Sequence, residues 1–283
     1  MGSNRSLPIA WYGRVLVVIG FAVTVGTGAG LFLAPRSLGE NFAWTIKVPL
    51  TAAFIGAGYL AGAALGLALV LRDGLWPRSR IVLATAFVLL VTNLIATLRF
   101  VNDFHLASGS GLQQVVAWVW LVVYVTLPPA VLAVLIAHER RAGRATWRVE
   151  EPLTPVTRAL FAATAAGLTV VGLWLFFDPD GALATRWPWH LTPVSAAIVG
   201  TWPLTFAATF GWALVERDWR RVRIAVAPGA AVTLSHLFSA ARLSETFTGG
   251  NPAAIVYVAS VASIPAVLGA AWFSQRARRD LSN

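Results

Sequence analysis

The stretch GAGLFLAP at residues 28–35 closes the first apolar run of this chain, and a related stretch, GLWLFFDP, stands at residues 172–179. Both begin with glycine and end with proline, and corresponding residues are 144 positions apart. A repeat on this scale predicts that each copy is one structural unit that buries a face against the other. The same spacing relates further pairs, which are Pro8 and Pro152, Arg14 and Arg158, Pro49 and Pro193, and Gly56 and Gly200.

After a one-residue deletion, the match continues at a spacing of 143 along the third apolar run of each copy. The repeat therefore divides the chain into three expected segments. They are a first four-helix repeat at 1–141, a cytoplasmic linker at 142–152 and a second four-helix repeat at 153–283.

Composition places the chain in a lipid bilayer. Hydrophobic residues make up 57% of it, charged residues only 12%, and the mean hydropathy is +0.70, whereas soluble domains carry roughly 25% charged residues. A helix needs about 20 apolar residues to cross about 30 Å of hydrocarbon, and eight runs reach this length. They lie at 14–33, 50–71, 80–101, 115–137, 157–177, 193–215, 222–243 and 253–273.

The eight runs are expected to be helices, because an open strand edge cannot satisfy its backbone groups in lipid. The predicted fold is therefore an all-α integral membrane protein with eight transmembrane helices. Each copy holds an even number of spans, so both copies enter the membrane from the same side. This predicts two parallel repeats related by a pseudo-two-fold axis along the membrane normal.

Basic residues are distributed unevenly between the two sides of this arrangement. Of the 22 lysines and arginines, 17 fall on the side of the two termini. The other five are Arg36, Lys47, Arg99, Arg186 and Arg242. By the positive-inside rule, both termini are expected in the cytoplasm and the protein in the plasma (inner) membrane. The net charge of +10 then serves orientation and contact with the lipid bilayer, so no nucleic-acid partner is expected.

Small residues and prolines predict how some of the helices pack. Gly58, Gly62 and Gly66 follow one another at a spacing of four in the second span, close to Gly56. This pattern predicts close contact between helix backbones. In the seventh span the pair Pro228-Gly229 predicts a kink or an interruption.

Tryptophans near the ends of the spans predict an aromatic belt at the membrane surface, where an amphipathic ring suits the headgroup region. They are Trp11, Trp44, Trp76, Trp187, Trp189 and Trp219.

The third span of each copy carries an arginine near its extracytoplasmic end, Arg99 in the first and Arg242 in the second. Asp103 and Glu245 follow them within one helical turn and are in reach of an ion pair. Brought together across the axis, the two arginines would bind a small anionic ligand or a lipid headgroup, because guanidinium recognises carboxylate and phosphate. The alternative is that both are ordinary helix-end arginines that extend to the membrane surface.

Asn93 and His236 occupy corresponding positions deeper in the same two spans. A buried imidazole can relay protons, since its ordinary pKa of about 6.5 is easily moved. The alternative is a histidine that simply hydrogen-bonds to Ser239 or a neighbouring helix. Both residues join the arginines and the two carboxylates as candidate ligand-binding residues, and none is assigned a catalytic role.

Motifs for metals, cofactors and known catalytic triads are not found. The chain has no cysteine, which excludes thiolate sites. Its four histidines lack the HxxxH or HExxH spacing that puts two ligands on one helix face. No metal and no cofactor is therefore expected.

The opening of each copy resembles DoxX-like four-helix membrane proteins. The resemblance is carried by Arg14 and an apolar helix that leads into the stretch at 28–35 and then into a second helix rich in small residues. It implies that the chain is two such units fused. Some members of that family are similar in role to accessory subunits of quinone-linked oxidoreductases, but the resemblance carries no catalytic residues over to this chain.

Three hypotheses for function follow. Parallel repeats with a polar, broken helix favour transporter-like binding or translocation of a small molecule or lipid between the repeats, at Arg99, Arg242 and His236. The alternative is a non-catalytic scaffold or accessory subunit that works through a membrane-protein partner. The third is a membrane enzyme acting on a lipid or quinone, with His236, Asp103 or Glu245 as acid or base.

Overall fold

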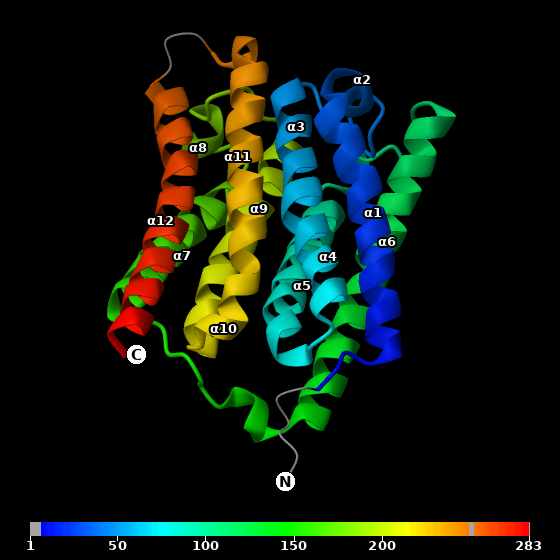
Figure 1. The fold of residues 1–283 in the computed structure, drawn as a ribbon. Helices are drawn as coiled ribbons and strands as arrows, with labels where there is room; N and C mark the ends of the chain where they lie inside the picture. The colour runs from blue at the N-terminus through cyan, green and yellow to red at the C-terminus, as the bar shows by residue number, and fades with distance from the viewer. Residues whose placement is uncertain (1–6, 249–251, 283) are drawn as a thin grey trace.

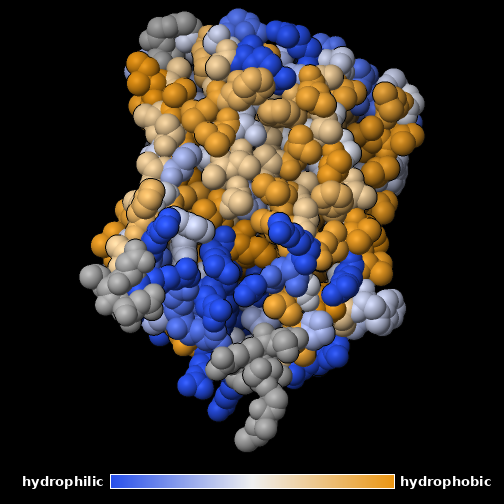
Figure 2. Space-filling view, viewed as in Figure 1, coloured by the Kyte–Doolittle hydropathy of each residue, from blue (hydrophilic) through white to orange (hydrophobic). Residues whose placement is uncertain are grey.

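The computed structural model describes residues 7–248 and 252–282, whose regular structure is helical apart from two isolated bridges. Among these residues, eight helices are long and apolar enough to cross a membrane, which confirms the eight predicted spans. Figure 1 shows them side by side in one bundle, with the start of α1 and the end of α12 at the same, lower end. In Figure 2 a broad hydrophobic belt separates two hydrophilic ends.

The first four spans are α1 (Trp11–Leu33), a continuous rod of α3 (Pro49–Ala57), η2 (Gly58–Ala64) and α4 (Leu65–Asp73), then α5 (Trp76–Arg99) and α6 (Gly111–Ala142). The last four are α7 (Pro155–Phe177), α9 (Pro193–Glu216), a broken rod of α10 (Trp219–Val222), η5 (Arg223–Ala225) and α11 (Val226–Arg242), and α12 (Pro252–Ser282). Short helices in the connections are α2 (Pro35–Glu40), η3 (Val101–Asp103), η4 (Arg144–Trp147), α8 (Ala182–Thr185) and η6 (Ser244–Thr246).

The second span of each half lies at the centre of the bundle. More than half of the most apolar window is buried in the α3–α4 rod and in α9, against 11% in α12. The two halves meet through these central spans, because α5 packs on α9 while α11 packs on α3 and η2. Helices α1, α6, α7 and α12 leave much of their surface to lipid.

Each half is closed at its lower end by the same pair of backbone hydrogen bonds. In the first half Ile9 N donates to Gly74 O and Trp76 N donates to Leu7 O. In the second half Leu153 N donates to Arg217 O and Trp219 N donates to Glu151 O. Gly74 and Arg217 both end a helix with a positive φ, of 65° and 56°, which turns the chain back sharply.

Two glycines of the first half allow α1 to cross the second span at backbone distance. A Cβ on Gly28 would lie 2.6 Å from Leu60 N, and one on Gly56 would lie 2.4 Å from Phe32 N. The prediction of close packing therefore holds at Gly56. It is wrong at Gly62 and Gly66, where the nearest atoms stand 3.7 Å and 3.4 Å from an added Cβ. These two glycines leave space instead.

Two spans depart from regular α-helix. In the second span, η2 is a π-helical segment, a feature that is often found at functional sites. In the seventh span a 3₁₀ turn at η5 precedes α11, and Pro228 lies in the first turn of α11, where a missing N–H is tolerated. The predicted interruption thus occurs just before Pro228.

Most of the tryptophans expected in a surface belt are buried. Trp11 is 76% exposed, but Trp44, Trp76, Trp189 and Trp219 are at most 2% exposed, so the belt prediction is wrong for these four. Two of them join the halves, because Trp44 Nε1 donates to Ser195 Oγ and Trp189 Nε1 donates to Thr51 Oγ1. The indole N–H, which needs a partner when buried, finds it on the central span of the opposite half.

Candidate functional site

Arg99 and Arg242 each bind the end of the first helix of the other half. Arg99 Nη1 donates to Phe176 O at 2.7 Å, and Arg242 Nη2 donates to Phe32 O at 2.5 Å. These carbonyls belong to the last turns of α7 and α1, which lack partners within the helix. A cation there is also favoured by the helix dipole. The two guanidinium groups thus bind two different helices: Arg99 binds the end of α7, and Arg242 binds the end of α1.

The expected ion pairs of the arginines are not formed among the described residues. Glu245 pairs with Arg36 at 2.5 Å, from the connection after α1, and Arg242 is bonded to a carbonyl. Asp103 is exposed in η3 and makes no ion pair in the described part of the chain. The spacing along the helix predicts a carboxylate partner for each arginine, but both guanidinium groups hydrogen-bond to backbone carbonyls of the other half.

Asn93 and His236 also reach across. Asn93 Nδ2 donates to Leu89 O and to Thr201 Oγ1 of α9, at 2.9 and 3.1 Å. The His236 ring stacks on Phe54 with centroids 4.2 Å apart, and its Nε2 lies 3.1 Å from Phe54 O.

None of the six predicted site residues lines any of the three cavities described below. Ligand binding at these residues stays a prediction.

A cavity of about 150 Å³ lies between the two halves, on the lower side of the bundle centre. Its wall is apolar and includes the space left by Gly62 and Gly66, which Pro228 of α11 faces from across. Figure 2 shows a recess with a hydrophobic floor in this part of the surface, where α4 and α11 meet. The wall is drawn from α1, η2, α4, α5, α6, α9, η5 and α11, and none of the described residues that line it is charged.

Three aromatic residues with polar side-chain atoms line this cavity. Tyr59 of η2 and Tyr124 of α6 are hydrogen-bonded through their hydroxyl groups, and both are buried. Trp202 of α9 packs edge-on against Tyr59, with ring centroids 5.1 Å apart. Its indole Nε1 is buried and has no hydrogen-bond partner among the described residues.

The corresponding place in the second half is filled. A remnant of about 50 Å³ is lined by Phe161, Phe206 and Phe210. At a spacing of 144 these three residues correspond to Val17, Gly62 and Gly66, which line the larger cavity. Pro203 takes the place of Tyr59, so the filled site also lacks the polar pair.

A buried charge cluster that sequence reasoning missed lies below the cavity. Arg80 is 0% exposed and makes a two-pronged ion pair with Glu216, with Nε to Oε1 at 2.6 Å and Nη2 to Oε2 at 2.8 Å. It also binds Glu139 at 2.9 Å, and its guanidinium lies 3.7 Å from the ring centroid of Trp147. Arg221 pairs with Glu216 at 3.1 Å. The cluster ties α5 and α6 to α9 and to the linker.

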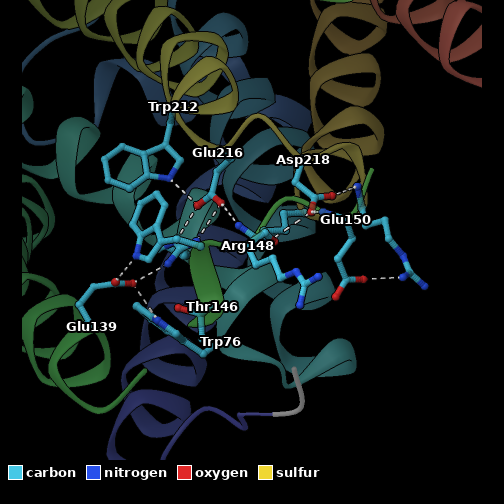
Figure 3. Close-up of polar contacts among 12 residues, drawn as sticks. Trp76, Glu139, Thr146, Arg148, Glu150, Trp212, Glu216 and Asp218 are labelled. Atoms are coloured by element: carbon cyan, nitrogen blue, oxygen red, sulfur yellow. Dashed lines mark hydrogen bonds and ion pairs between the residues drawn. The ribbon is translucent and has the colours of Figure 1, made fainter. Parts of the chain in front are cut away.

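Indole groups surround this cluster. Figure 3 shows Trp212 pointing at Glu216 and Trp76 pointing at Glu139, with bonds of 3.1 and 2.9 Å. Asp218 accepts from Glu150 N at 2.7 Å and so holds the linker. The sequence signal that could have indicated the charge cluster is a carboxylate at the end of an apolar run, as at Glu139 and Glu216. An open groove of about 460 Å³ between α5, α6 and α9 borders the cluster.

Within the described residues, no group of three or more His, Cys, Asp or Glu side chains could hold a metal ion. Comparison of the chain with protein-family models, with curated proteins and with solved structures finds no match.

Proposed function

We propose that this protein binds a small lipophilic molecule inside the membrane, in the cavity between η2, α5, α9 and α11, and that this binding serves its transfer or translocation. The observation that carries the proposal is the contrast at two positions. Glycine leaves the cavity open at 62 and 66, whereas phenylalanine stands at the corresponding positions 206 and 210, where only about 50 Å³ remains. Phe206 lies between the two places and borders both.

An empty cavity of this size would be costly. At about 24 cal/mol per Å³, 150 Å³ of enclosed and unfilled apolar volume would lower stability by roughly 3–4 kcal/mol, which is an upper bound here because the cavity is partly open. Apolar cavities of this kind stay dry and take up small apolar molecules. The absence of charge in the wall fits a neutral ligand that enters from the hydrocarbon.

The ligand is placed in the cavity rather than at Arg99 and Arg242 because both guanidinium groups already bind helix-end carbonyls. In this proposal the two arginines hold the halves together at the upper end. An anionic ligand would need a free cation in the wall, and the wall provides none.

The proposed architecture is a pair of parallel four-helix repeats with a pseudo-two-fold axis along the membrane normal. The reciprocal bonds from Arg99 to Phe176 and from Arg242 to Phe32 support it, since both partners are related by the repeat spacing. The bias of basic residues supports cytoplasmic termini and a plasma-membrane location. The resemblance to DoxX-like proteins is part of the same proposal.

The test uses benzophenone, a lipophilic ketone that crosslinks to nearby C–H bonds on illumination. The purified protein in lipid nanodiscs is labelled, and the labelled peptides are identified by mass spectrometry. We expect labelling in η2, α5 and α9 around the cavity. The variant Gly62→Phe/Gly66→Phe should lose it, because the cavity is then filled as the second half is.

Gly167→Phe is the matched control, since Gly167 has no neighbouring atom within 4 Å of an added Cβ. It adds the same ring on a lipid-facing surface and should leave the labelling unchanged. Equal labelling of the cavity peptides in the filled variant and the control would overturn the proposed function.

A further inference from the structure

Some polar side chains of the cavity wall already donate their hydrogen bonds within the protein, and others do not. The threonine hydroxyl groups are committed, because each donates to a carbonyl of its own helix. The donors and acceptors are Thr24 to Phe21 O, Thr85 to Ile81 O, Thr205 to Thr201 O and Thr209 to Thr205 O, at 2.7 to 3.1 Å.

The tyrosine pair is not fully committed. Tyr59 and Tyr124 together carry two hydroxyl protons, and the bond between them uses one. No other hydrogen bond of either hydroxyl is found within residues 7–248 and 252–282. One phenolic O–H is therefore left as a free donor, whether Tyr59 or Tyr124 donates the hydrogen bond between them.

Trp202 adds a second free donor. Its indole N–H can only donate, and among the described residues it has no acceptor although its side chain is 2% exposed. A buried donor without a partner costs about 1–3 kcal/mol. Both donors belong to residues that line one cavity, and the rings of Tyr59 and Trp202 contact each other.

These rings are held in place. Trp120 packs against Tyr124 with centroids 4.5 Å apart and also contacts Tyr59, and its own Nε1 donates to Thr97 Oγ1 at 2.9 Å. Gly58 allows the Trp202 ring to sit against the backbone, since a Cβ there would lie 2.6 Å from the ring. The rings that carry the free donors are thus held in position before any ligand arrives.

We infer that the ligand is a neutral lipophile that carries a carbonyl-type hydrogen-bond acceptor, a ketone or ester oxygen, which the tyrosine pair and Trp202 receive. This inference rests on the proposed function. The apolar wall takes the hydrocarbon part, and the free donors take the one polar atom. An anion is disfavoured because no charged side chain lines the wall.

The test compares benzophenone with diphenylmethane, in which a CH₂ group replaces the carbonyl. Each compound competes, in nanodiscs, with a benzophenone photolabel that carries a mass tag, and the ratio of the two half-inhibition concentrations is measured. Dividing the ratio of a variant by that of the wild type removes the different partitioning of the two compounds into lipid.

We expect Tyr59→Phe/Tyr124→Phe to reduce the preference for the ketone about five- to tenfold, the value of one neutral hydrogen bond. Trp202→Phe should reduce it in the same direction. Tyr257→Phe is the matched control, because Tyr257 is buried, does not line the cavity, and has no hydrogen-bond partner for its hydroxyl among the described residues. Its ratio should equal that of the wild type.

The outcomes separate the two proposals. If both compounds displace the label and their ratio is the same in all variants, the acceptor inference is wrong while the binding site stands. If neither compound displaces the label from the cavity peptides, the proposed function itself fails.

Discussion

The cavity of the first half and the filled site of the second half lie at corresponding places along the chain, and three side chains account for most of the difference in their volume. Val17, Gly62 and Gly66 surround about 150 Å³, where Phe161, Phe206 and Phe210 leave about 50 Å³. The closing hydrogen bonds at Gly74 and Arg217 occur in both halves. The comparison teaches that similar closing contacts of the backbone are compatible with different filling of the core, so that one half packs and the other keeps space.

The largest effect is expected from Arg80, whose position in the charge cluster is compared with that of Arg223 in the second half. Arg80→Ala removes the two-pronged partner of buried Glu216 and leaves Arg221 as its ion-pair partner, so the cost should approach the roughly 3–5 kcal/mol of breaking a buried pair outright. Arg223, at the corresponding position, forms no ion pair among the described residues, and Arg223→Ala should cost less than about 1 kcal/mol. Unfolding in mixed micelles measures both, and equal losses would contradict the difference.

The next largest effect comes from opening the filled site. Phe210→Ala should cost about 3 kcal/mol, because it removes a buried ring and leaves a void. The same variant should gain benzophenone labelling on peptides of α9 and α11. Stability is read from thermal unfolding and labelling from peptide mapping. A fall in stability without new labelling would show that the second half collapses rather than opens.

A smaller effect tests the shared backbone crossing. Gly56→Ala forces a Cβ to within 2.4 Å of Phe32 N and should cost about 1–3 kcal/mol. Gly200→Ala meets its neighbours at 3.0 Å and should cost less. The ratio of folded to aggregated protein after extraction measures both. A larger loss for Gly200→Ala would reverse the order that the two distances predict.

The smallest effect is expected inside the cavity. At Gly66 an added Cβ meets only Val82 at 3.4 Å and Pro228 at 3.9 Å. Gly66→Ala should therefore be neutral or raise the unfolding free energy by about 0.5–1 kcal/mol, since alanine is the better helix former. The midpoint of thermal unfolding checks it. A clear loss of stability would mean that Gly66 serves backbone contact after all.

Some of these features were accessible from sequence and others were not. The eight spans follow from the length of the apolar runs, a property that each run carries by itself. The cavity depends on what faces Gly62 and Gly66, and that is decided by α9 and α11 rather than by the second span. Aligning Gly66 with Phe210 could have pointed to the difference in filling, because glycine and phenylalanine differ so much in volume.

The polar residues show the same limit. Arg80 is the first residue of an apolar run and was counted among the basic residues on the side of the termini, although it is buried in α5. Arg99 was expected to pair within its own helix, but its partner is 77 residues away. Spacing along one helix predicts only local pairs, whereas in this bundle the buried donors are satisfied by the opposite half.

The bond between Arg242 and Phe32 has a consequence for the order of synthesis. The two residues are 210 positions apart in the chain. The last turn of α1 is therefore made and inserted long before its guanidinium partner leaves the ribosome. Until the seventh span is inserted, the last turn of α1 lacks the guanidinium group of Arg242 that binds it at the upper end. The final form of the first half therefore depends on the completion of the whole chain.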